Sequence, residues 1–303
     1  MTFPADAGWG NLPFGNWDPV IYSKEMIDFF RRVSVADEIT NNKYEGEISG
    51  GGSSVIILKE PELAVSDYAR GTEVIPQDIN DEALTLVIEQ ANYVAFNIDD
   101  IERKMSHVDF FGKMVAQTAY ALKNNYDSNI LTYMADNGTV SATVLGSNGS
   151  PVTIGFDAAD TYTPLDLFAA GSRLLNENDV PFENRFAVVT PAFIEYLYKE
   201  DSKLIETSVT GDRESEIRLT KQPTTKIIHG FKLYMSNNLT ASAGGSTRVL
   251  FGHTSAVATA NALTKTEQVR NPKSFGDMYR GLLVFGRKII RPEALFTANV
   301  TLS

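Results

Sequence analysis

The chain has 303 residues, enough for one large domain or two smaller ones. It carries 27 basic and 38 acidic residues, for a formal charge of −11, and 43% of its residues are hydrophobic, which is typical of a folded, soluble protein. Because this acidic balance repels phosphate, we expect no surface built to bind nucleic acid. The absence of cysteine excludes disulfides, thiolate catalysis, cysteine-ligated zinc and iron–sulfur clusters.

The sequence also lacks the patterns that direct proteins into or across membranes. Residues 1–20 contain no basic stretch followed by an apolar run, as a signal peptide would. Nowhere do about 18 apolar residues follow one another, so no membrane-spanning helix is predicted. We therefore expect a cytoplasmic origin and no membrane partner.

The first forty residues are predicted to form an arm. Proline and glycine recur too densely in residues 1–20 for a regular element. Apolar residues then follow at near-helical spacing in Ser23–Val35, with Ser23 as the N-cap, which predicts a short amphipathic helix. An apolar arm of this kind must lie against its own body or against a neighbour.

Residues 44–98 are predicted to be extended. An apolar run covers Val55–Leu58, residues 64–68 alternate, and Ala83–Ile98 is rich in strand-forming residues. The last stretch alternates between two faces, with Leu84, Leu86 and Ile88 on one and Thr85, Val87 and Glu89 on the other. Sixteen residues at about 3.3 Å each reach roughly 53 Å, well beyond a usual strand. The pattern predicts a long hairpin that bends or protrudes and finds its partner on another subunit.

A long helix is predicted over Ser106–Met134. Apolar residues recur there at steps of three or four, Ser106 and Asp109 resemble a capping box, and Asn137-Gly138 closes the far end. About 29 residues at 1.5 Å each give a rod of roughly 44 Å, which is long for a globular protein. Four apolar side chains are expected to pack on a sheet formed by the Ala83–Ile98 strand and the C-terminal strands: Phe111, Val115, Leu122 and Tyr126.

The remaining elements alternate between helix and strand, which predicts the α+β class. In chain order they are a hairpin at Thr139–Gly155, a helix at Pro164–Asn178, a strand at Arg185–Val189, a helix at Pro191–Lys199, a strand at Lys226–Met235, an extended stretch at Val249–Leu263 and a strand at Tyr279–Ile290. No self-similarity appears at a period of about 20–50 residues, so a repeat architecture is not expected.

Candidate catalytic residues are few. Asp99, Asp100 and Glu102 form a carboxylate cluster, and paired carboxylates perform acid/base chemistry when burial separates their pKa values. The same cluster precedes a helix N-terminus, where negative charge is favoured in any case. A soluble α+β enzyme that uses this cluster therefore stays open as the alternative to a structural protein.

Metal and phosphate sites are not expected. The histidines, at 107, 229 and 253, have no spacing that would place two ligands on one helix face. The run Gly50-Gly51-Gly52 leads into a strand and lacks the lysine of a phosphate-binding loop. No cofactor is implied by either pattern.

Four strings, in this order, resemble the major capsid proteins of tailed double-stranded DNA bacteriophages, which share the Hong Kong ninety-seven shell fold. They are Leu84–Met134, Val180–Tyr196 (VPFENRFAVVTPAFIEY), Gly230–Leu239 (GFKLYMSNNL) and Gly276–Ala294 (GDMYRGLLVFGRKIIRPEA). Their shared features are an apolar return strand, an acidic Ile-Asp-Asp lead, a long spine helix and a closing Gly-Arg-x-x-x-Arg-Pro-Glu. Together they span most of the chain.

The resemblance implies an α+β phage capsid fold with an N-terminal arm, an extended β-hairpin called the E-loop, a spine helix in a peripheral domain, and an axial domain. The corresponding boundaries are 1–43 for the arm, 44–98 for the E-loop and return strand, 99–160 for the peripheral domain, 161–255 for the axial domain, and 256–303 for C-terminal strands that complete both domains. It also implies a major capsid protein, without enzymatic activity or cofactor, that assembles into hexamers and pentamers around packaged DNA.

The implied partners are other copies of this chain, a separate scaffolding protein, a portal at one vertex and a decoration or cement protein. The chain shows no long segment before the arm that would act as a fused scaffold. The DNA is expected to be enclosed without specific binding. The expected location is the virion, after assembly in the host cytoplasm.

Six charged residues are predicted to make contacts between subunits: Lys59, Asp67, Arg70, Glu73, Arg287 and Glu293. We expect Arg70 to pair with Asp67 or Glu73, and Arg287 with Glu293. Lys59 lies in the hairpin, but a covalent cross-link needs a buried, matched Lys, Asn and Glu, so none is expected.

Four glycines are predicted to form the hinge of the hairpin: Gly50, Gly51, Gly52 and Gly71. Glycine reaches backbone conformations that strain other residues. We expect these positions to let the hairpin move between a precursor shell and an expanded one.

Overall fold

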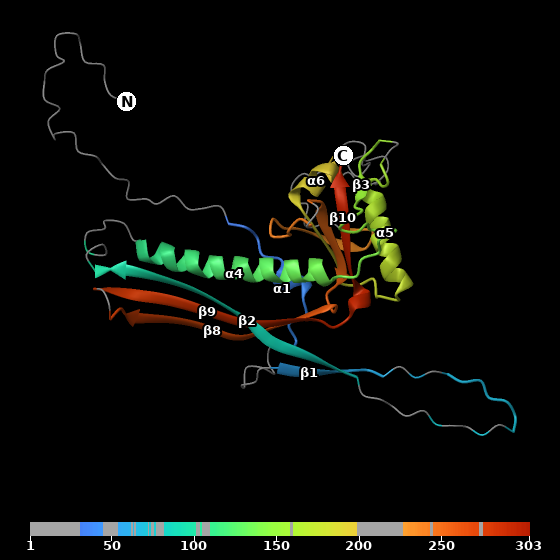
Figure 1. Ribbon diagram of the computed structural model, residues 1–303, viewed down its shortest axis with the longest axis horizontal. Coiled ribbons are helices and arrows are strands. Elements are labelled where there is room, and N and C mark those ends of the chain that lie inside the picture. The colour runs from blue at the N-terminus through green and yellow to red at the C-terminus, as the bar shows by residue number, and fades with distance from the viewer. Residues whose placement is uncertain are drawn as a thin grey trace, which may run out of the picture.

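The structure is a computed structural model, and its description covers residues 31–44, 54–61, 63, 65–71, 73, 76, 82–100, 104, 110–157, 160–198, 227–242, 245–272 and 275–303. Two sheets organise this part of the chain, and a long helix, α4 (Phe110–Asn137), runs from one to the other (Figure 1). A β-hairpin at the edge of one sheet projects from the rest of the molecule (Figure 1).

The first sheet has four strands in the order β1-β2-β9-β8, and every pair is antiparallel. Its strands are β1 (Ser54–Lys59), β2 (Glu82–Asp99), β8 (Val257–Arg270) and β9 (Gly276–Ile289). β2 changes partner along its length, because residues up to Val87 pair with β1 and residues from Ile88 onward pair with β9. A β-bulge between Ile88 and Gln90 marks this change. The over-long strand predicted from the sequence therefore both bends and protrudes.

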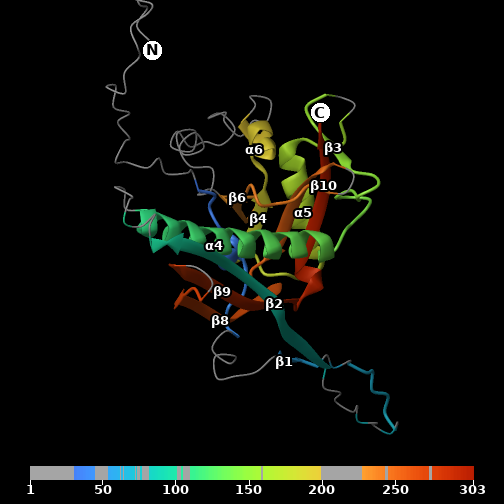
Figure 2. The same ribbon diagram turned by 60° about the vertical axis from the view of Figure 1, so that its left-hand side comes forward.

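The N-terminal half of α4 lies over one face of this sheet (Figures 1 and 2). Tyr126 meets the β9 residue Phe285 edge to face, with ring centroids 4.9 Å apart. Gly281 of β9 allows the close approach, since a Cβ at that position would lie 3.1 Å from the Cδ1 atom of Leu122. The predicted packing of the helix on this sheet is confirmed for Leu122 and Tyr126. Val115 is 41% exposed, and the side chain of Phe111 lies outside the described part of the structure.

The second sheet has six strands in the order β3-β10-β7-β4-β6-β5. They are β3 (Val152–Ile154), β4 (Arg185–Val189), β5 (Ile227–Ile228), β6 (Phe231–Met235), β7 (Thr247–His253) and β10 (Leu295–Leu302). Helices α5 (Pro164–Glu177) and α6 (Pro191–Tyr198) pack against it, and a short helix, η3 (Pro292–Ala294), precedes β10. All five residues of β4 are buried, as expected for a central strand.

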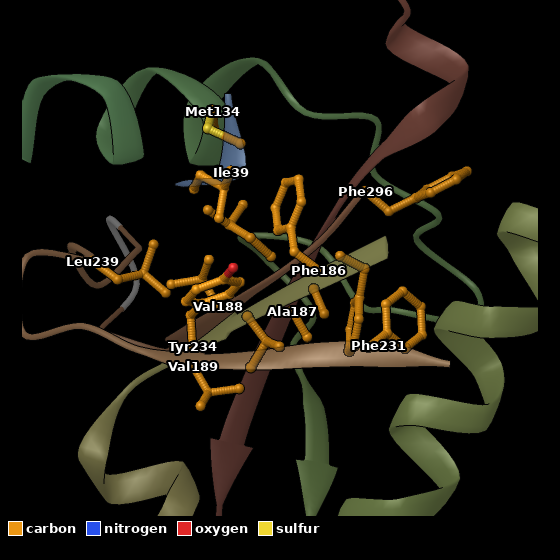
Figure 3. Packing of buried hydrophobic residues seen from close by; sticks show 14 of the residues in the cluster. Ile39, Met134, Phe186, Ala187, Val188, Val189, Phe231, Tyr234, Leu239 and Phe296 are labelled. Carbon is orange, nitrogen blue, oxygen red and sulfur yellow. The ribbon is translucent and has the colours of Figure 1, made fainter. Parts of the chain in front are cut away.

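The main hydrophobic core lies in the second sheet and includes the end of α4 (Figure 3). Met134 of α4 and Ile39 of the short helix α1 (Ala36–Ile39) are fully buried above the sheet residues Phe186 and Val188. The aromatic ring of Phe168 on α5 meets Phe251 of β7 edge to face at 5.4 Å. The spine helix is thus divided, with its first half on the four-stranded sheet and its last turns inside the six-stranded core.

Three expectations for the middle and end of the chain are wrong. Residues 139–155 do not form a hairpin, because β3 pairs in parallel with the distant strand β10. The strand expected at Lys226–Met235 is the pair β5 and β6, joined at His229 and Gly230, whose φ angles are +48° and +86°. The stretch Val249–Leu263 is divided by a turn, so that β7 and β8 belong to different sheets.

Three expectations concern segments that are described only in part. Of the helix predicted at Ser23–Val35, only residues 31–35 lie inside the described part of the chain; they are not helical, and α1 follows them. The capping residues Ser106 and Asp109 lie outside the described residues. Residues 65–68 are described and pair with no strand.

Candidate functional site

The hairpin formed by β1 and the first third of β2 projects from the rest of the molecule (Figure 2). Its two faces differ in how far they are covered. On the inner face, Ile57 and Leu86 are at most 8% exposed and form a small core with Ala260. On the outer face, Ile56, Leu58 and Val87 are 65%, 73% and 45% exposed. We call these three residues the outer stripe. The alternation predicted for Leu84–Glu89 is confirmed, because the exposed residues are the odd-numbered ones.

The loop between β1 and β2 carries three of the six predicted contact residues. Asp67, Arg70 and Glu73 are exposed, as is Lys59 at the end of β1. Gly71 has a φ of +95°, and a Cβ there would meet nothing within 4 Å. The other three predicted hinge residues, Gly50, Gly51 and Gly52, lie outside the described residues.

Arg287 has a different environment from the loop residues. Its guanidinium lies 4.6 Å from the ring centroid of Tyr133 and donates hydrogen bonds to the carbonyl and side-chain oxygens of Asn129. Burial lowers the pKa of Arg287. Arg287 therefore connects β9 to α4 within one subunit, whereas Glu293 is exposed on η3. An ion pair between the two across subunits would have to replace these contacts, and it stays a prediction.

An apolar groove of about 520 Å³ runs between α4 and the four-stranded sheet. Its apolar lining includes Phe96, Val115, Leu122, Tyr126, Tyr279 and Leu283. Lys123 and Asp37, which form an ion pair at 3.2 Å, also border it. Because Leu122 lines this groove, it is only half-buried. The helix lies against the sheet as expected, but its apolar face is covered less completely than the sequence predicts.

Asp100, one member of the carboxylate cluster, does not have the environment of an acid/base catalyst. Asp100 accepts hydrogen bonds from both guanidinium nitrogens of Arg270, and its side chain is 42% exposed. The hydrogen bond to Asp100 raises the pKa of Arg270. Glu102 lies outside the described residues. An exposed, ion-paired carboxylate lacks the burial that would separate the pKa values of two neighbouring acids.

Neither a metal centre nor a membrane-spanning helix is found in the part of the chain that the structure describes. Within it, no group of three or more His, Cys, Asp or Glu side chains is placed to hold a metal ion. The Nδ1 atom of His253 lies within hydrogen-bond distance of the hydroxyl oxygen of Ser255, at 2.7 Å. No helix among the described residues combines the length and apolar character needed to cross a membrane.

The comparison of the sequence with family models decides the identity. A model described as phage capsid protein matches residues 81–298, more than two thirds of the chain. The chain belongs to the phage capsid protein family. This coat protein has no match among curated proteins.

Solved structures support the same conclusion. A protein of Mycobacterium phage Che8 is 27% identical, covers 94% of this chain and 97% of its own, and superimposes with a TM-score of 0.80. The capsid structure of cyanophage P-SCSP1u contains a chain that is 17% identical to this one, and the two align over 100% of both chains with a TM-score of 0.70. The mature capsid of bacteriophage PhiM1 is 12% identical, covers 98% and 99%, and also has a TM-score of 0.70.

These findings confirm the resemblance and the α+β capsid fold expected from the sequence, and they do not support the enzyme alternative. The protein is a structural coat protein of the phage head shell, found in the virion. Sequence reasoning found the hairpin and the spine helix but missed the outer stripe as a surface and the groove beside α4. The signal for the stripe was the continuous apolar run Val55–Leu58, because a strand with no polar alternation places apolar side chains on both of its faces. Which face is covered depends on the tertiary contacts of Leu86.

Proposed function

We propose that this coat protein assembles through hexamers and pentamers into an icosahedral shell around double-stranded DNA, with its hairpin and arm lying over adjacent copies. The observation that carries the proposal is the outer stripe. A two-stranded ribbon is marginally stable alone, and Ile56, Leu58 and Val87 are left facing solvent. Burying a large apolar side chain contributes about 1.5–3 kcal/mol, so each neighbour that covers a stripe stabilises the contact.

Charged residues in the loop are proposed to add weaker contacts. Arg70 with Asp67 or Glu73 of an adjacent copy forms an exposed ion pair, worth about 0–1 kcal/mol. Repetition over a closed shell multiplies this small contribution. Assembly should therefore weaken as salt rises, and Arg70→Ala should reduce that salt dependence. Salt titrations of assembly by light scattering measure both; an unchanged salt dependence in the variant would remove Arg70 from the contact.

Gly50, Gly51, Gly52 and Gly71 are proposed to act as the hinge of the hairpin. The positive φ of Gly71 and the open space around it are compatible with this role. Replacing Gly51 and Gly52 with valine should hinder maturation, because valine restricts the backbone. If expanded, DNA-filled particles form at the normal rate in that variant, the hinge is elsewhere.

The acidic charge of −11 fits a wall that holds DNA without adhering to it. We propose that Lys and Arg serve contacts between subunits and not DNA, that a separate scaffolding protein directs assembly in the host cytoplasm, and that a portal and a cement protein complete the shell. Empty shells should show negligible affinity for duplex DNA at physiological salt.

Adjacent residues of β1 provide the test of the stripe. Ile56→Ala should reduce assembly with little change in the unfolding midpoint, because Ile56 is 65% exposed. Ile57→Ala, the matched control, should lower the midpoint, because Ile57 is 8% exposed and packs inside the subunit. Sedimentation and electron microscopy report assembly, and thermal unfolding reports stability.

The combined variant Ile56→Lys with Leu58→Lys should abolish closed particles while leaving a folded subunit, since a charge cannot be buried unpaired. Normal shells from that variant would exclude the stripe from the interface. A wild-type protein that stays a stable monomer, with a hydrolytic activity lost in Asp100→Asn, would overturn the proposed function altogether.

A further inference from the structure

A buried carboxylate holds the point where the N-terminal arm meets the body. Asp127, in the middle of α4, is completely buried. Its Oδ1 atom accepts hydrogen bonds from the backbone N–H groups of Val35 and Ala36, both at 2.8 Å, and from the hydroxyl of Ser34 at 3.1 Å. These donors belong to the residues just before and at the start of α1.

The other carboxylate oxygen of Asp127 connects to the six-stranded sheet. Its Oδ2 atom accepts a hydrogen bond at 2.7 Å from the side-chain amide of Asn238, in the loop after β6. Asn238 also donates to Asn124 of α4, and its oxygen accepts a hydrogen bond from the guanidinium of Arg32 at 2.9 Å. Asp127 and Asn238 thus join the arm, the spine helix and the second sheet.

Arg32 and its neighbour also contact α4. The backbone N–H of Arg32 donates to the hydroxyl of Tyr120 at 2.9 Å, and the guanidinium of Arg31 lies 5.8 Å from the same ring. Two ion pairs follow, from Asp37 to Lys123 and from Glu38 to Lys232, but all four of these side chains are at least 45% exposed. Exposed pairs contribute little, whereas a buried charge with four donors is costly to disturb.

We propose that Asp127 is a positioning residue for assembly: through Val35, Ala36 and Asn238 it fixes the direction in which the N-terminal arm leaves the subunit. The proposal rests on the assembly function, because the direction of the arm matters only if the arm reaches a neighbour. A carboxylate suits the position, since it accepts hydrogen bonds on both oxygens and has no donor of its own. If an asparagine replaced Asp127, its side-chain NH2 group would face the NH2 group of Asn238, and two donors cannot form a hydrogen bond with each other.

A reciprocal exchange of these two side chains tests the proposal on unassembled subunits. Asp127→Asn should increase hydrogen exchange in the peptide 31–40 by about 10- to 100-fold, the factor expected for losing a hydrogen bond to a charged group. Asn238→Asp alone places a second carboxylate against that of Asp127, and it should increase the hydrogen exchange of the same peptide by a similar factor. In the double variant, an amide at position 127 again faces a carboxylate at position 238, and the carboxylate still accepts the hydrogen bond from Arg32. The hydrogen bond to Asn124 is lost. Hydrogen exchange should therefore return to within about threefold of the wild-type rate.

Asp136→Asn is the matched control. Asp136 lies on the same helix and forms an ion pair with Arg248 at 2.7 Å, away from the arm. The Asp136→Asn variant should therefore leave the hydrogen exchange of peptide 31–40 unchanged. Should Asp127→Asn fail to fold, Ser34→Ala removes a single donor to the same oxygen and should loosen the same peptide more weakly.

The outcomes separate a positioning role from general stability. Selective loosening of peptide 31–40, reversed by the exchange, supports the proposal. A uniform rise across all peptides, no rise at all, or a double variant as loose as the singles would overturn it. Variants that loosen the arm yet assemble at the wild-type rate would overturn its link to assembly, while a wild-type protein that never forms shells would instead refute the proposed function.

Discussion

The six-stranded sheet and the projecting hairpin belong to one chain but are built differently. In the sheet, β4 is buried along its whole length and the aromatic rings of Phe168, Phe231 and Phe251 pack against one another. In the hairpin, only one face is covered, and Ile56 and Leu58 face solvent on the other. The subunit therefore obtains its own stability mainly from the sheet, and the proposed function has the hairpin completed by other copies.

The largest expected effect comes from the aromatic core. Phe251→Ala should reduce the free energy of unfolding by about 3–5 kcal/mol, because Phe251 is fully buried between Phe168 and Phe231. Phe275→Ala, at a site 81% exposed, should change it by less than about 0.5 kcal/mol. Urea unfolding of the two variant subunits measures the free energy of unfolding of each. Equal losses would mean that the sheet is not the stable part of the molecule.

The spine helix offers a matched pair of leucines. Leu131 is fully buried in the six-stranded core, so Leu131→Ala should cost about 2–5 kcal/mol. Leu122 borders the groove and is half-buried, so Leu122→Ala should cost less than about 2 kcal/mol, the lower end of the range for a full core truncation. Chemical denaturation of the two variants compares the halves of α4 directly. A larger loss at Leu122 would reverse the order of stability that the two sheets imply.

The smallest effect concerns pH at the junction of α1 and β6. Hydrogen bonds from Tyr234 and then from Lys232 lower the pKa of Glu38. A lowered folded-state pKa means that Glu38 adds stability above its ordinary value of about 4.5, and that this stability is lost as the pH falls through the folded-state pKa.

Because the Glu38 side chain is 60% exposed, the contribution is about 0–1 kcal/mol. Glu38→Gln should remove this part of the pH dependence. Unfolding midpoints measured at several pH values below 5 and at pH 7 test it. An identical pH profile in the variant would show that this contact does not stabilise the junction.

Elements with local signals were predictable from the sequence. The strand at Arg185–Val189 is found as predicted, and the helix that follows it ends within a residue of its predicted end. The α5 helix begins at Pro164 after a capping box in which Thr163 and Asp166 exchange hydrogen bonds. Each of these segments carries its own start signal and its own hydrophobic period.

Elements that depend on distant partners were not predictable. β3 pairs with β10, and no local pattern in Val152–Ile154 reveals a partner so far along the chain. The turn that separates β7 from β8 contains neither glycine nor proline, so the sequence gives no sign that the two strands enter different sheets. Asp127 looks like an ordinary helix-surface acid until the arm and Asn238 cover it. Its role depends entirely on tertiary contacts.

Cryo-electron microscopy of particles formed by the purified protein tests the central claim most directly. We expect closed shells in which the hairpin of each subunit lies on an adjacent copy and the side chains of Ile56, Leu58 and Val87 are buried at that contact. Closed shells in which these three side chains still face solvent, or a protein that forms no shells, would contradict it.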